Sequence, residues 1–374
     1  MTKQNKRVVS YCIFALSCIF VLIYNYHKTT TKPHVNVYLW YNMIPQDVFD
    51  SFEKETGIKV VKSFYDSNDI MEAKLITCNS GYDIVFPSFI PYAIRQSRAG
   101  IYEKINLQNL KRRSNLDTII TKKFINCSDA NTCLIPLFYT VMGILYNKNT
   151  IMKIFGTEEA RYEMIFHPEN LKLLQSHGVN FPSEYIDVFP QLQKYLNMNP
   201  QTQDRMERIL ECINHINKIK SYVKKFFSST IINDYMSNEM SVAICSSDNA
   251  IRIMKKSQTA RFTTCGDYGV IAIECAAIPK GAKNIDNAYK FIDYILRPDI
   301  ATIIANKCGL FVNTIDMQKS DFFTENDIAK FIFLKPSEDQ DNAIYEKICN
   351  RLWIKSITSK QNIDIDKQDL YIYR

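Results

Sequence analysis

Short strands and amphipathic helices alternate along the first hundred residues, and this alternation restricts the fold more than any other feature of the chain. Runs of β-branched and aromatic residues are separated by segments with apolar residues at helical spacing, and Gly57 and Gly100 end two of those segments. Short connections between alternating strands and helices predict a parallel sheet with helices on both faces. The predicted strands are 35–40, 59–64 and 82–86, and the predicted helices are 45–56, 67–77 and 91–99.

The pattern changes after residue 136 and predicts a second α/β unit. We expect the chain to cross between the units at 136–139, at 274–279 and near 309–313. The elements predicted there are strands at 137–146, 241–245 and 270–278, and helices at 168–175, 187–196, 203–227, 284–296 and 298–307. The predicted lobes are 35–138 with 275–312 for the first and 139–274 with 313–358 for the second, followed by an extension at 359–374.

The amino terminus carries an export signal. Lys3, Lys6 and Arg7 precede an uncharged apolar run over residues 8–24, which is the order of the basic and apolar regions of a signal peptide. No clear cleavage site follows, so residues 1–30 are predicted to be either a cleaved signal peptide or an uncleaved anchor. In both cases the basic flank stays in the cytoplasm and the body lies in the periplasm.

Charge and motifs favour binding of a small solute over catalysis or nucleic-acid binding. The formal net charge is +7, but residues 1–34 hold five basic residues and no acid, which leaves +2 for the rest. Phosphate binding usually needs a concentrated basic face, so we expect no nucleic acid. Catalytic signatures such as G-x-S-x-G, Walker A and H-E-x-x-H are missing. We therefore predict no catalytic residue and no cofactor.

The cysteines show no spacing typical of a metal site, so no metal is expected. In an exported protein Cys127 and Cys133 can close a disulfide across a polar loop. The alternative is that cysteines are reduced and buried as small apolar residues. We favour burial for Cys78, Cys212, Cys245, Cys275 and Cys308.

Several segments resemble the periplasmic polyamine-binding proteins that feed spermidine and putrescine importers. The resemblance runs from about residue 35 to about residue 356 and is strongest in the helix pair NAYKFIDYILRPDIA with the preceding AIP. Other matching stretches are VNVYLWYNMI, FEKETGIKVV, YDSNDIMEAKL, GYDIVFPS, GILYNK, HPENLKLLQSHGVNF and RLWIKS. The resemblance implies a type II periplasmic-binding-protein fold, in which two α/β lobes joined by a multi-strand hinge close on a ligand in a central cleft.

The resemblance also implies a function. The chain is expected to be the extracytoplasmic solute-binding component of an ABC importer, a monomer that captures putrescine or spermidine and passes it to a membrane permease. Binding a polyamine requires carboxylates for its ammonium ends and aromatic faces along its methylenes. Alternatives are the same fold with another cationic or amine solute, or a membrane-tethered sensor or interaction protein.

Six positions match ligand-binding positions of that family: Trp40, Ser88, Glu184, Asp187, Asp248 and Glu274. Glu274 is the strongest candidate, because a carboxylate inside the apolar run VIAIECAAIP is costly unless it is paired. For the others, other roles stay open: Trp40 in the core, Ser88 as a helix cap, and Asp187 as an acid at a helix start. Near Asp248 the register can shift by one residue to Asn249.

The chain departs from the family where aromatic residues are expected. Met43, Ser246, Ala272 and Leu310 stand at those positions. Tyr41, Phe89 or Phe311 can replace some of the missing rings from adjacent positions. The acids are therefore largely kept while most of the aromatic lining is lost.

Overall fold

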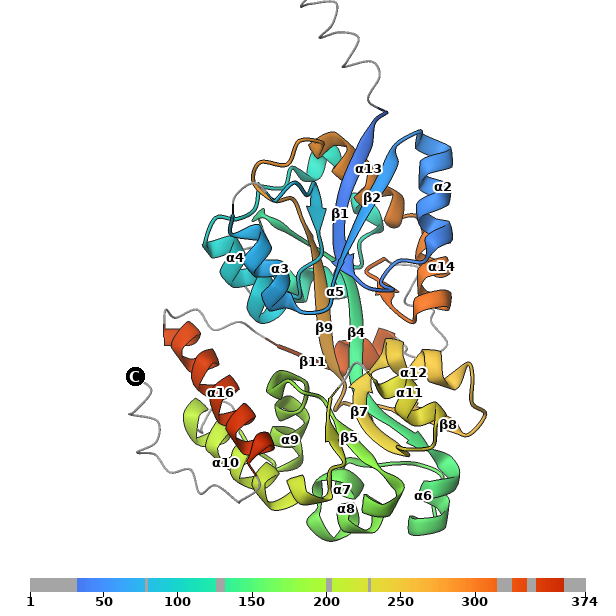
Figure 1. Ribbon diagram of the computed structural model, residues 1–374, viewed down its shortest axis with the longest axis vertical. Helices are drawn as coiled ribbons and strands as arrows, with labels where there is room; N and C mark the ends of the chain where they lie inside the picture. The colour runs from blue at the N-terminus through green and yellow to red at the C-terminus, as the bar shows by residue number, and fades with distance from the viewer. Residues whose placement is uncertain are drawn as a thin grey trace, which may run out of the picture.

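The computed structural model describes residues 32–77, 80–125, 132–199, 204–227, 230–314, 325–334 and 341–359. It has two bodies, each with strands covered by helices, and the long strands β4 and β9 run from one body to the other (Figure 1). The predicted two-lobed α/β architecture is confirmed. Among the described residues no helix is both long and apolar enough to cross a membrane, and the predicted signal or anchor at 1–30 lies outside them.

The first lobe begins with the predicted strand–helix alternation. Strand β1 pairs in parallel with β2 and β3. Helix α2 ends where Gly57 adopts a left-handed φ of 68° and its N–H bonds back to Glu53. Ser67 caps α3 by accepting from the Asp69 N–H. The elements are β1 (His34–Trp40), α2 (Gln46–Thr56), β2 (Lys59–Tyr65), α3 (Asn68–Leu75), β3 (Ile84–Val85), η1 (Phe89–Ala93), α4 (Ile94–Arg98) and α5 (Thr118–Ile125).

Two antiparallel strands connect the lobes. Strand β4 (Leu134–Asn147) pairs with β9 (Val270–Ala277) from Leu134 opposite Ala277 to Met142 opposite Val270. Farther along, β4 also pairs with β7 (Val242–Ser246) and β8 (Ala260–Thr263), and nearer its start with β10 (Phe311–Val312). With β5 (Val179–Phe181) and β6 (Lys225–Phe226) at one edge, one hydrogen-bonded sheet therefore continues through both lobes, in the order β2-β1-β3-β9-β4-β7-β5-β6.

The second lobe contains most of the remaining elements. The predicted helix over 203–227 is confirmed up to Ile219 and wrong beyond it, because the chain there makes a short turn and adds β6 to the edge of β5, with Lys225 opposite Asn180. The elements are α6 (Lys148–Phe155), α7 (Tyr162–Phe166), α8 (Pro168–Leu174), β5 (Val179–Phe181), η6 (Tyr185–Asp187), α9 (Phe189–Tyr195), α10 (Arg205–Ile219), η7 (Lys220–Tyr222), β6 (Lys225–Phe226), α11 (Ile231–Met236), β7 (Val242–Ser246), α12 (Ser247–Met254), β8 (Ala260–Thr263), α15 (Glu325–Lys330), β11 (Ile332–Phe333) and α16 (Asp341–Thr358).

Each lobe has its own apolar core. The larger core gathers the first-lobe residues together with Ile271 and Ile273 of β9, and a second core includes Trp353 of α16. Ile328 of α15 and Phe331 pack in the first core, whereas the sequence predicts 313–358 in the second lobe, so the lobe boundaries stay a prediction. The expectation of burial is confirmed for Cys212, Cys245, Cys275 and Cys308, while Cys78 and Cys127 lie outside the described residues.

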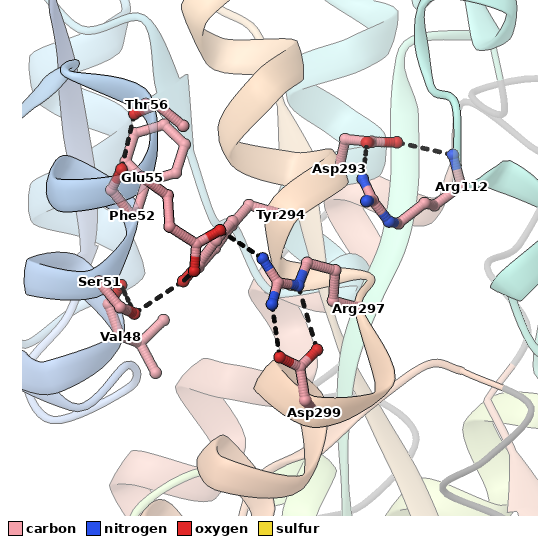
Figure 2. Close-up of polar contacts among 10 residues, drawn as sticks. All are labelled: Val48, Ser51, Phe52, Glu55, Thr56, Arg112, Asp293, Tyr294, Arg297 and Asp299. Atoms are coloured by element: carbon pink, nitrogen blue, oxygen red, sulfur yellow. Dashed lines mark hydrogen bonds and ion pairs between the residues drawn. The ribbon is translucent and has the colours of Figure 1, made fainter.

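A polar network fastens the helices of the first lobe to one another (Figure 2). Helices α13 (Ile285–Ile295) and α14 (Pro298–Cys308) break at the predicted Arg297–Pro298 step. At this break Arg297 donates to Glu55 of α2 at 2.6 Å and to Asp299 at 2.6 Å. Tyr294 donates to Ser51 at 2.7 Å, also on α2. Helices α2, α13 and α14 are thus tied together as a unit.

Candidate ligand-binding site

Glu274 carries a carboxylate held by two neutral donors. Ser88 Oγ donates to its Oε1 at 2.8 Å, and Trp40 Nε1 donates to its Oε2 at 3.2 Å. The backbone of Glu274 lies opposite Phe138 of β4 and forms a bridge with Ser88. Three segments that are far apart in the sequence therefore meet at one side chain. This group, Trp40, Ser88 and Glu274, is called the first wall below.

Ser88 is oriented by a residue that the sequence analysis missed. Asn68, at the start of α3, donates from Nδ2 to Ser88 Oγ at 2.8 Å, and its Oδ1 accepts from the Ser88 N–H at 3.3 Å. Ser88 makes no side-chain capping bond to the helical turn that follows it. Its hydroxyl is instead directed to Glu274. The motif YDSNDIMEAKL contained Asn68, but nothing in the sequence indicated its contact with Ser88.

Trp40 stands at the end of β1 and keeps part of its ring accessible. Its ring packs at 4.5 Å, tilted, against Tyr65. The Tyr65 hydroxyl in turn donates to the carbonyl of Phe86 at 2.5 Å. Tyr65 thus supports the indole, and Trp40 as a whole residue is only partly buried.

Glu184 and Asp187 lie on the second lobe and are called the second wall below. They flank the short turn η6 that precedes α9, with the Asp187 N–H bonded to the Glu184 carbonyl at 3.2 Å. Trp353 of α16 fixes this turn, because its Nε1 donates to the Ser183 carbonyl at 2.6 Å and its ring packs on Phe189. Trp353 belongs to the motif RLWIKS, so this motif supplies the side chain that fixes the turn.

The carboxyl groups of the two walls influence one another. The pKa of Glu274 is raised to about 8, mainly by burial and to a lesser extent by the charges of Glu184 and Asp187, while the hydrogen bonds from Ser88 and Trp40 act to lower it. Burial and the Glu184 charge raise the pKa of Asp187 to about 8. Burial, followed by the charge of Asp69, raises the pKa of Glu184. A helix amino terminus lowers the pKa of an acid, so desolvation outweighs that effect at Asp187.

These three carboxyl groups have raised pKa values, yet none of the three residues is fully buried. Glu184 is exposed, and Asp187 and Glu274 are half-buried. Among the described residues no lysine or arginine forms an ion pair with any of the three. In the same part of the chain no three metal-binding side chains lie together. The arrangement is therefore a set of carboxylates with no internal cation, which suits an organic cation from outside.

Asp248 is differently placed. It accepts a hydrogen bond from Ser246 and lies 3.5 Å from Arg252 Nη2, one turn along α12. Asn249 also donates to Ser246, at 3.1 Å. The structure therefore gathers Trp40, Ser88 and Glu274 directly, couples Glu184 and Asp187 to them electrostatically, and gives Asp248 a cation of its own.

Two of the three suggested replacement rings are buried. Phe89 and Phe311 are buried in the first core, where they pack against Phe124 and Tyr139. Tyr41 is 70% exposed and makes an edge contact with Phe64 at 5.5 Å. Of the three suggested replacement rings, Tyr41 alone is thus exposed.

Comparisons with known structures define the class of fold. The model resembles the Tp0655 lipoprotein of Treponema pallidum, with a TM-score of 0.73 and 22% identity over 86% of this chain and 99% of that one. It also resembles the spermidine/putrescine ABC transporter substrate-binding protein PotD of Streptococcus pneumoniae, with a TM-score of 0.69 and 19% identity over 87% and 100% of the two chains. The fold is that of a two-lobed solute-binding protein, and no family model matches the chain.

Sequence relatives narrow the class. The putrescine-binding periplasmic protein SpuD of Pseudomonas aeruginosa is 31% identical over 280 residues, which cover 73% of this chain and 76% of that protein. The putrescine-binding periplasmic protein PotF of Escherichia coli is 30% identical over 73% and 75% of the two chains. The chain belongs to the family of periplasmic putrescine- and spermidine-binding proteins. This confirms the predicted class, a periplasmic solute-binding protein rather than an enzyme.

Proposed function

We propose that this chain captures putrescine or spermidine between its lobes and delivers it to the permease of an ABC importer. The observation that carries the proposal is the Glu274 carboxylate, which Ser88 and Trp40 hold by hydrogen bonds and which no lysine or arginine of the described residues neutralises. The charges of Glu184 and Asp187 raise the pKa of this carboxyl group, which supports a site with three acids. The names of the relatives point to the same ligands. We expect it to act as a monomer and to bind no nucleic acid.

Each wall has a distinct role in this proposal. Glu274 receives one ammonium end of the ligand, and Trp40 covers the adjoining methylenes with its ring face. Asp187 receives the other end, and Glu184 adds charge for a third amine. Because the walls belong to different lobes, a ligand that neutralises both favours the closed form over the open one.

A second candidate is a different amine-bearing solute. The observation that favours it is the loss of rings at Met43, Ser246, Ala272 and Leu310, since Met43 and Leu310 are buried and offer little surface. A ligand with a shorter or bulkier apolar part depends less on an aromatic lining. The carboxylates serve both candidates, so the ligand's shape distinguishes them.

The test is calorimetric titration of the full chain with putrescine, spermidine, agmatine and 1,4-butanediol. Butanediol has the shape of putrescine without its charges, so the proposal expects binding of the diamine and none of the diol. Tighter binding of agmatine than of both polyamines favours the second candidate. Binding of the diol as tightly as putrescine contradicts any site built on carboxylates.

Glu274→Gln sharpens the test. The amide keeps the shape and loses the charge, and truncating one partner of a desolvated charge pair costs about 2–5 kcal/mol, so binding should weaken by about 30-fold or more. Glu158→Gln is the matched control, because Glu158 is exposed on the second lobe. If Glu274→Gln binds putrescine as tightly as wild type, the proposal is contradicted.

A further inference from the structure

Helix α12 touches both lobes. Its residues Ala250 and Ile253 pack in a small core with β7 and β8 of the second lobe, while Ile251 packs in the core of the first. Helix α12 also contacts α14 of the first lobe. Gly309, which ends α14 with a left-handed φ of 71°, approaches so closely that a Cβ there would lie 2.8 Å from Asp248 Cα. The two helices meet without space for a side chain.

Arg252 joins the lobes across this contact. Its Nε donates to the carbonyl of Cys308, the last residue of α14, at 2.9 Å. Its Nη2 donates at 3.4 Å to the carbonyl of Asn42, two residues beyond Trp40. The last carbonyls of a helix lack partners within the helix and carry partial negative charge, so a guanidinium is well suited to them. Arg252 thus links the second lobe to two parts of the first lobe, the end of α14 and the loop that follows Trp40.

We propose that Arg252 is a positioning residue that holds the two lobes in the conformation where both walls face one site. Asp248 then serves to orient Arg252 and does not bind the ligand. The side chains of Arg252 and Asp248 are only 22% and 19% exposed, and a carboxylate that already has a guanidinium beside it gains little from a further ammonium. The proposal rests on the proposed function only for its effect on ligand affinity.

The part of the first lobe that Arg252 contacts is fixed to the rest of that lobe. Helix α14 is fastened to α2 through Arg297 and Glu55 at its start (Figure 2). At its last turn Lys307 donates to Asp47 of α2 at 2.7 Å, so we expect the carbonyl that Arg252 holds to move together with the first lobe. Removing the guanidinium therefore changes the balance between open and closed arrangements. When the competent conformation is less populated, the apparent affinity falls in proportion.

Small-angle X-ray scattering of the ligand-free full chain tests whether Arg252 holds the two lobes together. Arg252→Gln should raise the radius of gyration above that of wild type. Arg252→Lys should raise it as well, because an ammonium lacks the fork that reaches both carbonyls. Arg261→Gln is the matched control, since Arg261 donates to the carbonyls of Gln258 and Ala260 beside it in the sequence. Thermal unfolding of each variant confirms that it is folded. A radius unchanged in both Arg252 variants overturns the proposal.

Titration with putrescine separates Arg252 from Asp248. Arg252→Gln should weaken binding by about tenfold through loss of the competent conformation. Asp248→Asn should weaken it by less than about threefold, because the two carbonyl bonds of Arg252 remain. A loss in Asp248→Asn that exceeds the loss in Arg252→Gln overturns the inference and makes Asp248 a ligand carboxylate. The scattering result needs no ligand, so it stands or fails even if no polyamine binds.

Discussion

The two walls of the site hold their acids in different ways. On the first wall, each oxygen of Glu274 has a neutral donor, and the residue lies in a central strand of the sheet. On the second wall, Glu184 and Asp187 flank a single turn, and the described residues supply no side-chain donor to either carboxylate. The first wall is therefore organised before a ligand arrives, whereas the second depends on the ligand's charge.

This difference assigns separate tasks to the walls. An acid that is already oriented loses little conformational freedom on binding, so in the proposed function we expect Glu274 to set where the first ammonium lies. Two neighbouring acids without donors repel each other and the acid opposite until a cation arrives. We therefore expect the second wall to couple capture of the ligand to closure.

Removing the charges of the second wall should have the largest effect. Glu184→Gln combined with Asp187→Asn should weaken spermidine by about 30-fold or more, because an ammonium then enters a desolvated site without its partner. Asp187→Asn alone should cost less, since Glu184 is near enough to substitute. Calorimetric titration measures both, with Glu158→Gln as the control. A double variant that binds like wild type shows that the second wall plays no part.

Affinity should also depend on pH, by at least about tenfold between pH 8 and pH 6.5. The pKa of Glu274 and of Asp187 is about 8, and a cation binds the ionised form, so affinity falls as pH drops below 8. The ligand's amines stay protonated throughout this range. Titration in buffers of different ionisation enthalpy should show proton release on binding.

The stability of the ligand-free protein should change with pH in the opposite direction to its ligand affinity. Folded-state pKa values above the ordinary carboxyl values mean that the ligand-free folded state holds more protons than the unfolded state between about pH 4 and pH 8. The melting temperature without ligand should therefore fall as pH rises through this window. Glu274→Gln should flatten the fall, and an unchanged slope in that variant contradicts the assignment.

Trp40→Phe should give the smallest effect. The variant keeps an aromatic face but removes the N–H that donates to Glu274, so we expect binding to weaken by about threefold to tenfold. It should also raise the pKa of Glu274, and the pH profile of affinity should shift upward with it. Tyr41→Phe, at the exposed neighbouring ring, is the control. Equal losses in both variants contradict a specific role for the indole.

The sequence allowed the fold to be predicted wherever local signals agree with the tertiary structure. Gly57 and the Arg297–Pro298 step marked real helix ends, because each constrains the backbone locally. The failure at 220–227 has a tertiary cause, since β6 forms only by adding to the edge of β5. Glu274 could be found because a charge inside an apolar strand is conspicuous by itself.

The contacts that complete the site were beyond prediction from the sequence. Asn68 orients Ser88 across twenty residues, and Arg252 reaches Asn42 across more than two hundred. Both are ordinary polar residues on helices, and their positions carry no compositional signal. For Asp248 the resemblance indicated a carboxylate but not its neighbour Arg252, whose presence changes the proposed role of the acid.

The position of helix α16 late in the sequence bears on when the site is complete during synthesis and export. Trp353, near the end of this helix, holds the Ser183 carbonyl and thereby the turn between Glu184 and Asp187, while Trp40 stands near the start of the described chain. The candidate site therefore combines residues that are more than three hundred positions apart. We expect a chain still emerging from the ribosome or the export channel to lack the second wall's anchor, and ligand capture to begin only once translocation has passed residue 353.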